Sequence, residues 1–427
     1  MTPDSPSPAA APLPSRSAAT RVRAARLGAR GAQYAARLRG GKASVFPGYV
    51  ALRVAPDLLT TLLAGRTVCI VSGTNGKTTT TALIAAALGD DVTTNTDGAN
   101  LPTGWVSALL EHPGAGPVVL EVDESYLPAA FDAAPDAVAV LLNLSRDQLD
   151  RHSETRMLAL RWRDTITAHP QVRVVANVDD PLVVWAAGAA TAVTWVAGGA
   201  AWHSDAAACP ACGALLVRAD GTWSCPSCTL RRPEPTIAPA AGAVRVDGRD
   251  VTYSLALPGR ANRGNVAMAV GAALAHGVAA DDALRAIENV RSASGRYARH
   301  QVDGRELVVL LAKNPAGWVE TLEVIDELLP DRNTGTVVVA INARGPDGRD
   351  PSWLWDVPFE RLAGRRVVAT GERATDLAVR LDNAGVEYRK DTRAPLVAAR
   401  AVTDDPVVIA ATYTNFLTVS RELDRSA

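Results

Sequence analysis

The residues with the clearest chemical potential lie in a glycine-rich stretch, GTNGKTTT, at positions 73–80. A β-branched run, 68–71, precedes it and an alanine- and leucine-rich run, 78–88, follows it, so we expect a buried strand, a tight turn and a helix. The N–H groups and the dipole at the start of such a helix bind phosphate. Lys77 would add positive charge for the β- and γ-phosphates, and Thr78 would offer a hydroxyl ligand to Mg²⁺.

The motif departs from a full Walker A pattern, because Val71 stands where that pattern has its first glycine. Its context still favours phosphate binding. Further strands are expected at four places, with helical patterns between them: 117–124, 137–144, 172–178 and 192–196. Strands that alternate with helices predict a parallel α/β sheet covered on both faces.

Polar side chains gather at the carboxyl ends of these predicted strands, which is where parallel sheets bind their ligands. The residues at these ends are Lys77, Glu121, Asp123, Glu124, Asn143 and Asp147. Carboxylates beside a triphosphate are most simply ligands of Mg²⁺, either directly or through water. The sequence therefore predicts a nucleotide and magnesium site at one edge of the sheet.

Four of the five cysteines form two pairs, CPAC at 209–212 and CPSC at 225–228, and the fifth, Cys69, lies in the predicted core strand. Each CxxC pair can hold one side of a tetrahedral Zn²⁺ ion. Four thiolates, from Cys209, Cys212, Cys225 and Cys228, would fill its coordination sphere, so we expect a structural zinc ion. A redox dithiol is the alternative, which two successive pairs disfavour. This cysteine usage is not that of a secreted disulfide framework and fits a cytoplasmic protein.

Composition narrows the class of protein further. The chain has 427 residues, 48% of them hydrophobic, which is enough for two or three domains. A net charge of −1 gives no argument for a nucleic-acid partner, and no apolar run reaches the ~18 residues of a membrane span. Residues 1–42 carry one acid, Asp4, and eight basic residues. We expect residues 1 to about 20 to be disordered. The basic part from Arg16 to Lys42 is expected to be either a solvated helix or a peripheral contact with anionic lipid at the inner face of the plasma membrane.

A second α/β unit is expected over 301–427, after a first unit over 43–300 that contains the zinc-ribbon insertion at about 200–235. The first unit resumes after the insertion with a strand at 251–257 and a helix over roughly 266–276. Strands of the second unit are expected near 306–312, 336–342, 366–370 and 407–413, which predicts a small Rossmann-like domain. The stretch 342–356 carries Trp353, Trp355 and three acids. It is interpreted as a binding surface, with a plain surface turn as the alternative.

Taken together, these motifs resemble those of the Mur ligase family over roughly residues 45–427, apart from the cysteine knuckles. The shared markers are GTNGKTTT at 73–80, the acidic strand end at 121–124, Asn143, Asp147 and Asp150, Asn177 to Asp180, and PGRxNxxN at 258–265. The resemblance is greatest to the MurT branch, the synthetase subunits of lipid II isoglutaminyl synthase. That branch shares the four-cysteine insertion, LNLSRDQLDR at 142–151, AKNPAGW at 312–318 and DGRDPSWLWD at 347–356.

The resemblance implies an α/β fold with a P-loop-type parallel central sheet, an inserted four-cysteine zinc ribbon and a smaller Rossmann-like C-terminal domain. It implies ATP-dependent amidation of the α-carboxylate of D-glutamate in the lipid II stem through an acyl phosphate. Ammonia would come from a GatD-type glutamine amidotransferase subunit in a heterodimer. The alternative is a stand-alone amino-acid-adding ligase of the Mur or folylpolyglutamate type, and a non-enzymatic ATP-dependent scaffold is a third hypothesis.

The same resemblance implies roles for individual residues. ATP would be bound by Gly73, Thr74, Asn75, Gly76, Lys77, Thr78, Thr79, Asn262, Asn265 and Arg296. Magnesium would be bound by Thr78, Glu121, Glu124, Asp147 and Gln148, with Lys77 and Glu124 at the catalytic centre. Either Asp350 or Asp356 would complete the catalytic triad of the partner subunit, and the sequence does not choose between them. Asn314 is expected in the cleft between the domains.

One feature departs from the ordinary members of the family. They carry a histidine where this chain has Gln148, and many use a carbamylated lysine as a metal bridge. Lysine occurs here only at positions 42, 77, 313 and 390, so none lies between 78 and 312. This departure puts the usual second-metal site in doubt, because Gln148 offers only a neutral oxygen.

Overall fold

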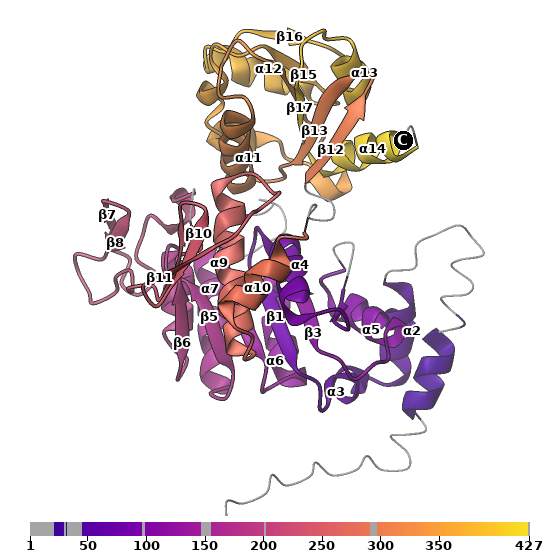
Figure 1. Ribbon diagram of the computed structural model, residues 1–427, viewed down its shortest axis with the longest axis vertical. Coiled ribbons are helices and arrows are strands. Elements are labelled where there is room, and N and C mark those ends of the chain that lie inside the picture. The colour runs from indigo at the N-terminus through magenta and orange to yellow at the C-terminus, as the bar shows by residue number, and fades with distance from the viewer. Residues whose placement is uncertain are drawn as a thin grey trace, which may run out of the picture.

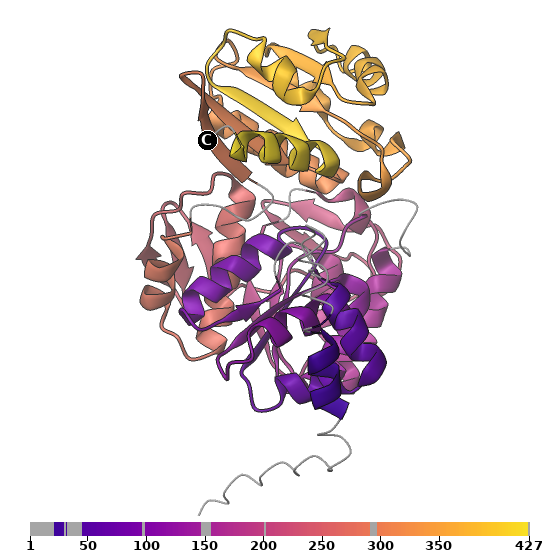
Figure 2. The ribbon, with the colours of Figure 1, turned by 90° about the vertical axis from the view of Figure 1, so that its right-hand side faces the viewer.

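The computed structural model describes residues 21–29, 31, 45–95, 99–146, 155–199, 202–290 and 297–425 (Figure 1). Three residues of the predicted site, Asp147, Gln148 and Arg296, lie outside the described residues. The chain forms two α/β units, each built around its own sheet. Figures 1 and 2 show the C-terminal unit, in orange and yellow, stacked on one end of the central unit.

Among the described residues, the central sheet has nine strands in the order β11-β10-β9-β6-β5-β4-β1-β3-β2. Their bounds are β1 (Val68–Ser72), β2 (Thr93–Thr94), β3 (Val118–Val122), β4 (Val138–Leu141), β5 (Arg173–Asn177), β6 (Val193–Val196), β9 (Ile237–Ala240), β10 (Ala243–Val246) and β11 (Arg249–Thr252). Neighbours from β2 to β9 run parallel, as predicted for the early strands. The prediction is wrong at the other edge, where β10 pairs antiparallel with β9 and β11. In place of the expected strand 251–257, β11 ends at Thr252 as the second strand of an antiparallel hairpin.

Helices cover both faces of the central sheet. One core lies under α2 (Phe46–Val54), α3 (Leu58–Leu63), α5 (Pro102–Glu111), α6 (Leu127–Ala133), α7 (Thr155–Ala168) and α8 (Pro181–Ala187), and the other under α4 (Lys77–Leu88), α9 (Arg260–Ala275) and α10 (Ala280–Ile287). Strand β1 shows why both faces need cover. Val68 and Ile70 pack into the first core while Cys69 and Val71 pack into the second, because successive strand residues point to opposite faces.

Helix α9 begins at Arg260, six residues before the predicted start at Val266. The preceding Gly259 has φ of +98°, a conformation that favours glycine. The motif PGRANRGN therefore does not precede the helix but forms its first turns. Asn262 and Asn265 are three residues apart in these turns, so they share one side of α9.

The insertion between β6 and β9 contains a short 3₁₀ helix, η2 (Ser204–Ala206), and an antiparallel pair, β7 (Val217–Ala219) and β8 (Thr222–Ser224). Asp220 and Gly221 make its turn with positive φ angles of 50° and 72°. Trp223 of β8 is buried and donates its indole N–H to the carbonyl of Val178, 3.0 Å away. The hairpin is therefore anchored to the chain just after β5.

The C-terminal sheet has six strands within the described residues, in the order β12-β13-β17-β14-β15-β16. They are β12 (Tyr297–Val302), β13 (Arg305–Leu311), β14 (Thr336–Ala340), β15 (Val367–Thr370), β16 (Tyr388–Lys390) and β17 (Val407–Ala411). The four predicted strands are confirmed, whereas β12 and β16 were not predicted. The sheet begins at Tyr297, a few residues before the expected boundary, because β12 pairs antiparallel with β13.

Helices also cover both faces of this second sheet. One core lies under α11 (Pro315–Leu328) and α12 (Ala374–Asn383). The other core lies under α13 (Pro395–Arg400) and α14 (Tyr413–Asp424). Three 3₁₀ turns lie between β14 and β15: η3 (Gly345–Asp347), η4 (Ser352–Asp356) and η5 (Phe359–Leu362). Within the part of the chain that the structure describes, no helix is long and apolar enough to cross a membrane.

The two units meet where α9 and the phosphate loop face α11. Asn314 caps the start of α11 and donates its amide N–H to Asn75 Oδ1 at 3.2 Å. Arg260 at the start of α9 lies 3.0 Å from Glu323 of α11. The C-terminal ends of the central strands are thereby turned toward the second domain.

Candidate active site

The turn after β1 closes tightly around glycine. Gly73 and Gly76 have φ of +147° and +83°. A Cβ on Gly73 would lie 2.9 Å from the Cβ of Leu142, and one on Gly76 would lie 2.7 Å from Asn265 Oδ1. Both positions therefore require glycine, for their backbone conformation and for their close neighbours. The turn leads directly into α4, whose first residue is Lys77.

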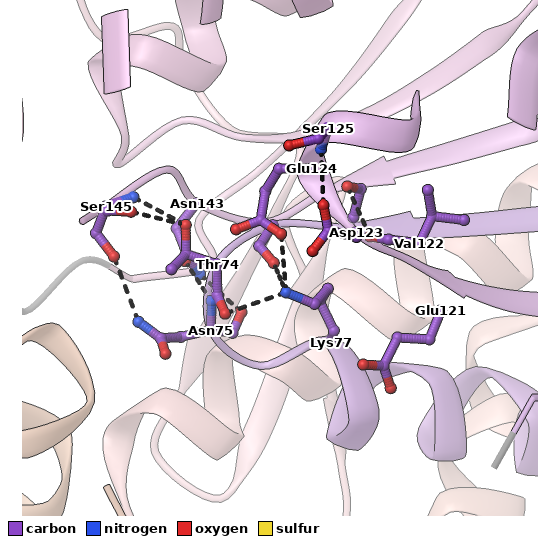
Figure 3. A network of polar contacts seen from close by, with 12 residues as sticks. Thr74, Asn75, Lys77, Glu121, Val122, Asp123, Glu124, Ser125, Asn143 and Ser145 are labelled. Atoms are coloured by element: carbon purple, nitrogen blue, oxygen red, sulfur yellow. Dashed lines mark hydrogen bonds and ion pairs between the residues drawn. The ribbon is translucent and has the colours of Figure 1, made fainter. Parts of the chain in front are cut away.

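The loop after β4 holds this turn through paired hydrogen bonds (Figure 3). Asn143 accepts from the backbone N–H of Asn75 at 2.9 Å through its side-chain oxygen, and its amide donates to the carbonyl of Asn75 at 3.0 Å. The Thr74 hydroxyl accepts from the backbone N–H of Ser145 at 3.0 Å and donates to the Ser145 carbonyl at 3.1 Å. These bonds fix the turn to the carboxyl end of β4.

Lys77 is buried, with its ammonium 3.1 Å from Glu124 Oε2 (Figure 3). The same ammonium donates to the carbonyls of Gly73 and Thr74. Glu124 follows the end of β3, where its carbonyl accepts from the indole N–H of Trp162 at 2.9 Å. The Lys77 ammonium therefore lies between the phosphate loop and Glu124, which follows β3.

Glu121 lies beside the first turn of α4. The Thr78 hydroxyl donates to Glu121 Oε2 at 2.8 Å. The backbone of Glu121 is held by Asn95, which accepts from its N–H at 2.7 Å and donates to its carbonyl at 2.8 Å, and by the indole N–H of Trp105. A hydroxyl and a carboxylate oxygen at this spacing, next to a phosphate loop, are the donor set that Mg²⁺ uses in such sites. Thr78 and Glu121 therefore fit a magnesium ion.

The buried carboxyl of Asp180 stabilises the loop after β4. It accepts from the backbone N–H of Leu144 at 2.7 Å, between the two residues that hold the phosphate loop. Its other oxygen caps α8 by accepting from Leu182 at 2.8 Å and Val183 at 3.3 Å. Burial raises the pKa of Asp180 to about 6, against the lowering effect of these three N–H groups. This carboxyl joins the β4 loop to the β5–α8 turn.

A cleft runs from the phosphate loop between the two domains. It is lined by Asn75, Gly76, Thr79, Asn262 and Asn265 on the central side and by Tyr297, Lys313, Gly317 and Glu320 on the C-terminal side, among others. The structure thus brings the predicted nucleotide residues of α9 next to the phosphate loop. The cleft is polar beside the phosphate loop and also has apolar lining, which includes Leu257 and Val324.

Arg146 links three parts of the molecule. Its backbone N–H and its guanidinium both donate to Asp205 of η2, at 2.8 and 2.6 Å, and its guanidinium lies 3.5 Å from Asp356 of the C-terminal domain. Trp202 also donates its indole N–H to Asp205. The insertion therefore positions the residue that precedes the predicted metal ligands Asp147 and Gln148, and it connects this residue to the tryptophan-bearing stretch.

Only some side chains of the stretch 342–356 are exposed. Trp353 is buried and stacks on Trp318, with ring centroids 6.2 Å apart, so the interpretation of this tryptophan as a binding residue is wrong. Trp355 is exposed, and Arg380 lies over its ring. Arg380 also donates to the carbonyls of Leu354 and Val357, which fixes the loop.

The two candidate triad acids have different surroundings. Asp356 faces the central domain through its ion pair with Arg146. Asp350 is exposed and uses Oδ1 to accept from the backbone N–H of Ser352 at 2.8 Å. The third acid of the stretch, Asp347, is buried and bonds Thr414 at the start of α14.

The four cysteines of the insertion come together, with all Sγ atoms within 4.8 Å of one another. Cys209 and Cys228 are 3.6 Å apart, and Cys212 and Cys225 are 3.4 Å apart. A tetrahedral zinc ion with Zn–S bonds of about 2.3 Å has sulfurs about 3.8 Å apart. The backbone N–H of Ser227 also points at the Cys225 sulfur, at 3.4 Å. The cluster fits a four-coordinate zinc ion with no position left for a reacting water.

Several residues of this site were not singled out from the sequence. Asn95, Trp105 and Trp162 hold the two glutamates through their backbones, and Arg146 and Asp205 connect the insertion to the site. Asp205 lies within the predicted insertion, ahead of its first cysteine pair. No periodicity marks such residues, because each acts through hydrogen bonds to a distant part of the chain. Asp147, Gln148 and Arg296 keep their predicted roles only as predictions, since they lie outside the described residues.

Two family models match the chain. The Mur ligase middle domain matches residues 71–273, and the MurT ligase C-terminal domain matches residues 311–416. The subunit MurT of lipid II isoglutaminyl synthase (glutamine-hydrolyzing) from Staphylococcus aureus (strain COL) is 28% identical over 424 residues, which cover 92% of this chain and 96% of that protein. The protein of the same name from Streptococcus pneumoniae (strain ATCC BAA-255 / R6) is 29% identical over 388 residues, covering 83% and 85%.

Solved structures agree on the fold. A pseudomurein peptide ligase type C from Methanothermus fervidus matches with a TM-score of 0.67 at 18% identity, over 87% of this chain and 81% of that one. MurF ligase from Thermotoga maritima, in complex with ADP, matches with a TM-score of 0.62 at 16% identity, over 88% and 85%. These likenesses concern the fold. The chain belongs to the Mur ligase family, and its C-terminal domain is of the MurT type.

Proposed function

We propose that this chain is the synthetase subunit of a lipid II isoglutaminyl synthase. It would amidate the α-carboxylate of D-glutamate in the lipid II stem through an acyl phosphate, with ATP as the phosphoryl donor. The observation that carries the proposal is the pairing of a phosphate loop with a MurT-type C-terminal domain whose exposed Asp350 is free to face another protein. Enzymes of this family are ATP-dependent and use Mg²⁺, and both fit the cleft described above.

In this proposal the chain's own residues act mainly by position and charge. The phosphate loop cradles the triphosphate, and Lys77 neutralises charge on the transferring phosphoryl group. Thr78 and Glu121 would hold Mg²⁺, which supplies further positive charge at the phosphates when bound. Glu124 keeps the Lys77 ammonium in place beside the loop. Asn314 of the C-terminal domain contacts Asn75 of the loop, so closure of the domains and positioning of ATP are joined.

Ammonia would come from a glutaminase subunit of the GatD type. The chain's cysteines give it no nucleophile of its own for glutamine, because four lie in the zinc-type cluster and Cys69 is buried in β1, where burial raises its pKa to about 12. A partner must then supply the nucleophilic cysteine. We assign Asp350 as the carboxylate that completes the partner's triad, since Asp356 is engaged by Arg146 within this chain.

The zinc ion is assigned a structural role. The insertion is too small to form a core of its own, and its four-thiolate cluster would hold it together. In turn it carries Asp205, which positions Arg146 at the edge of the active site. The zinc would therefore act on the reaction only through the placement of this loop.

The test is mass spectrometry of lipid II after incubation of the chain with ATP, Mg²⁺ and an ammonium salt. Conversion of a carboxylate to an amide lowers the mass by about 1 Da. A gain of an amino-acid residue would instead identify a stand-alone Mur or folylpolyglutamate-type ligase. Absence of both products, and of ATP hydrolysis with lipid II and ammonium, would leave the scaffold hypothesis. Addition of the glutaminase partner should allow glutamine to replace ammonium.

A further inference from the structure

Exposed apolar and basic side chains lie on the first two helical segments of the described chain. Residues 21–29 are helical, and Leu27 in this segment is 68% exposed. On α2, Phe46 and Tyr49 are 55% and 51% exposed. Large aromatic and aliphatic side chains normally lose more of their surface than this, so three of them in two short helices call for an explanation.

The two helices pack against each other, so these side chains belong to one region. Gly28 faces α2, and a Cβ at this position would lie 3.5 Å from Val50 Cγ1. Ala25 and Ala29 are buried in the same core as Ala51 of α2. The inner sides of both helices are therefore used for packing, and the residues named above are on what remains exposed.

Positive charge surrounds the apolar side chains. Arg21, Arg23 and Arg26 are exposed on the first segment, and Arg53 is exposed on α2. The Arg53 guanidinium lies 5.8 Å from the centre of the Tyr49 ring. Residues 21–29 and 45–54 contain no aspartate or glutamate. We name the set Leu27, Phe46, Tyr49, Arg21, Arg23, Arg26 and Arg53 the N-terminal face.

The N-terminal face is connected to the acidic side of the active site through α5. Gly48 of α2 donates its backbone N–H to Ser107 of α5 at 2.8 Å and packs against the Thr103 carbonyl in the first turn of α5. Just before α5, the Asn100 carbonyl accepts from the backbone N–H of Asp123, next to Glu124. Figure 1 shows α2 and α5 at the end of the central unit away from β7 and β8. The N-terminal face therefore lies on the side of the central unit that carries α5, away from the insertion with the cysteine cluster.

We propose that the N-terminal face binds the surface of an anionic lipid bilayer. Aromatic and leucine side chains would enter the headgroup region while the four arginines contact anionic lipids, which is the chemistry of interfacial amphipathic helices. Charge complementarity selects this occupant, because a face with four cations and no acid matches an anionic surface. The biological purpose of this surface rests on the proposed function. A lipid-linked substrate would reach the acidic edge of the site along the same membrane.

The charge component is tested with the full chain and sucrose-loaded vesicles that contain no lipid II. The probe is a phosphatidylglycerol and phosphatidylcholine mixture, compared with phosphatidylcholine alone. Wild type should bind the anionic vesicles, and binding should fall as salt rises. The variant with Arg21, Arg23, Arg26 and Arg53 changed to Gln should bind at least about tenfold more weakly at low salt. The matched control changes four exposed arginines elsewhere, Arg161, Arg231, Arg421 and Arg425, to Gln and should bind as wild type.

The apolar component has its own pair of variants. Leu27→Ser, Phe46→Ser and Tyr49→Ser in one chain should weaken vesicle binding, whereas the same change at three other exposed apolar residues, Leu215, Val379 and Val397, should not. Melting curves of both triple variants should match wild type, because every changed side chain is exposed. Wild-type binding no stronger to anionic than to neutral vesicles would overturn the proposal. Equal losses in the face variants and their controls would also overturn it.

Activity separates this proposal from the proposed function. The face variants should amidate a water-soluble, short-chain lipid II analogue at the wild-type rate and vesicle-borne lipid II more slowly. Vesicle binding without amidation of either substrate would leave the lipid surface standing and remove the proposed function. Wild-type amidation of both substrates by face variants that also bind vesicles as wild type does would remove the lipid surface and leave the function standing.

Discussion

Lys77 Nζ lies 3.1 Å from Glu124 Oε2, and both side chains are less than a tenth exposed. A lysine on the surface of a phosphate-binding loop would have little packing role, so its removal would be expected to leave the fold unaffected. The ion pair changes that expectation. Removal of one partner from a buried pair leaves an uncompensated charge, which costs about 3–5 kcal/mol.

We therefore expect Lys77→Met to lose both activity and stability. The amidation rate should fall by far more than tenfold, because charge stabilisation of the phosphoryl group is lost. The free energy of unfolding should also fall, since Glu124 stays buried without its partner. Lys77→Met combined with Glu124→Gln should recover much of the stability and none of the activity. Urea titrations and amidation with ammonium salt measure the two effects separately.

The single variant Glu124→Gln is the control for this pair. Recovery of more than about a tenth of the wild-type rate in the double variant would remove the phosphate role from Lys77, because one decade corresponds to only about 1.4 kcal/mol. Full stability of Lys77→Met would show that the buried pair is not a structural element.

The cysteine cluster leads to a prediction on metal content. The protein as purified should hold one equivalent of zinc per chain, and Cys212→Ser should lower it. The same variant should lower the melting temperature more than the specific activity of the folded fraction, because a bound metal would hold the insertion, and with it Asp205, in place. Cys69→Ala is the matched control and should keep one equivalent, since Cys69 lies in β1. A chelator that stops turnover at once without changing the melting curve would move the zinc into the active site.

Much of the fold could be predicted from the pattern of hydrophobic residues in the sequence. The buried β-branched run at Val68 and the parallel strands after it were predictable, because short β-branched runs that alternate with helical patterns leave few alternatives to a parallel sheet. The convergence of Lys77, Glu121, Glu124 and Asn143 was predictable for the same reason: the carboxyl ends of parallel strands meet at one edge.

The antiparallel hairpins β10–β11 and β12–β13 were missed although the sequence marks them. Asp220-Gly221, Asp247-Gly248 and Asp303-Gly304 all have positive φ at both positions and join β7 to β8, β10 to β11, and β12 to β13. An Asp-Gly pair between two short apolar runs is a strong hairpin signal, because type I′ turns need positive φ at both residues. Attention to these pairs would have predicted both antiparallel sheet edges.

The polar contacts between distant segments could not be predicted. Arg146 and Asp205 are 59 residues apart, and Asn75 and Asn314 are 239 residues apart. Neither pair belongs to a periodic pattern, and each forms only once the domains and the insertion have packed. Trp353 shows the opposite error, since a tryptophan in a polar stretch became part of the C-terminal core by stacking on Trp318.

Asp180 leads to a prediction on pH. Burial raises its pKa to about 6, from an ordinary value of 3.8. Between these two pH values the unfolded chain has released this proton while the folded chain retains it. The contribution of Asp180 to the free energy of unfolding should therefore fall as pH rises from about 4 to 6, by at most about 3 kcal/mol, and stay constant above that.

The measurement compares urea titrations of wild type and Asp180→Asn at several pH values from 4 to 7, since other titrating groups cancel in the difference. Wild type should lose stability relative to the variant as pH rises. A gain instead would show that the three backbone N–H groups that Asp180 accepts from outweigh its burial and lower the pKa.

The last prediction separates Asp350 from Asp356. A histidine in the partner's active site needs a carboxylate on its second ring nitrogen to fix its tautomer and orientation. Asp350→Asn should therefore abolish amidation with glutamine while amidation with ammonium chloride persists, because the ATP site lies in the central domain. Asp356→Asn is the matched control. It loses only a half-exposed ion pair to Arg146, so both activities should fall together, by a few-fold at most. Partner binding, checked by gel filtration, should survive in both variants, since Trp355 and not one carboxylate would bury more of the interface. Equal loss of both activities in Asp350→Asn would place this acid in the synthetase reaction, and selective loss of the glutamine reaction in Asp356→Asn would exchange the two assignments.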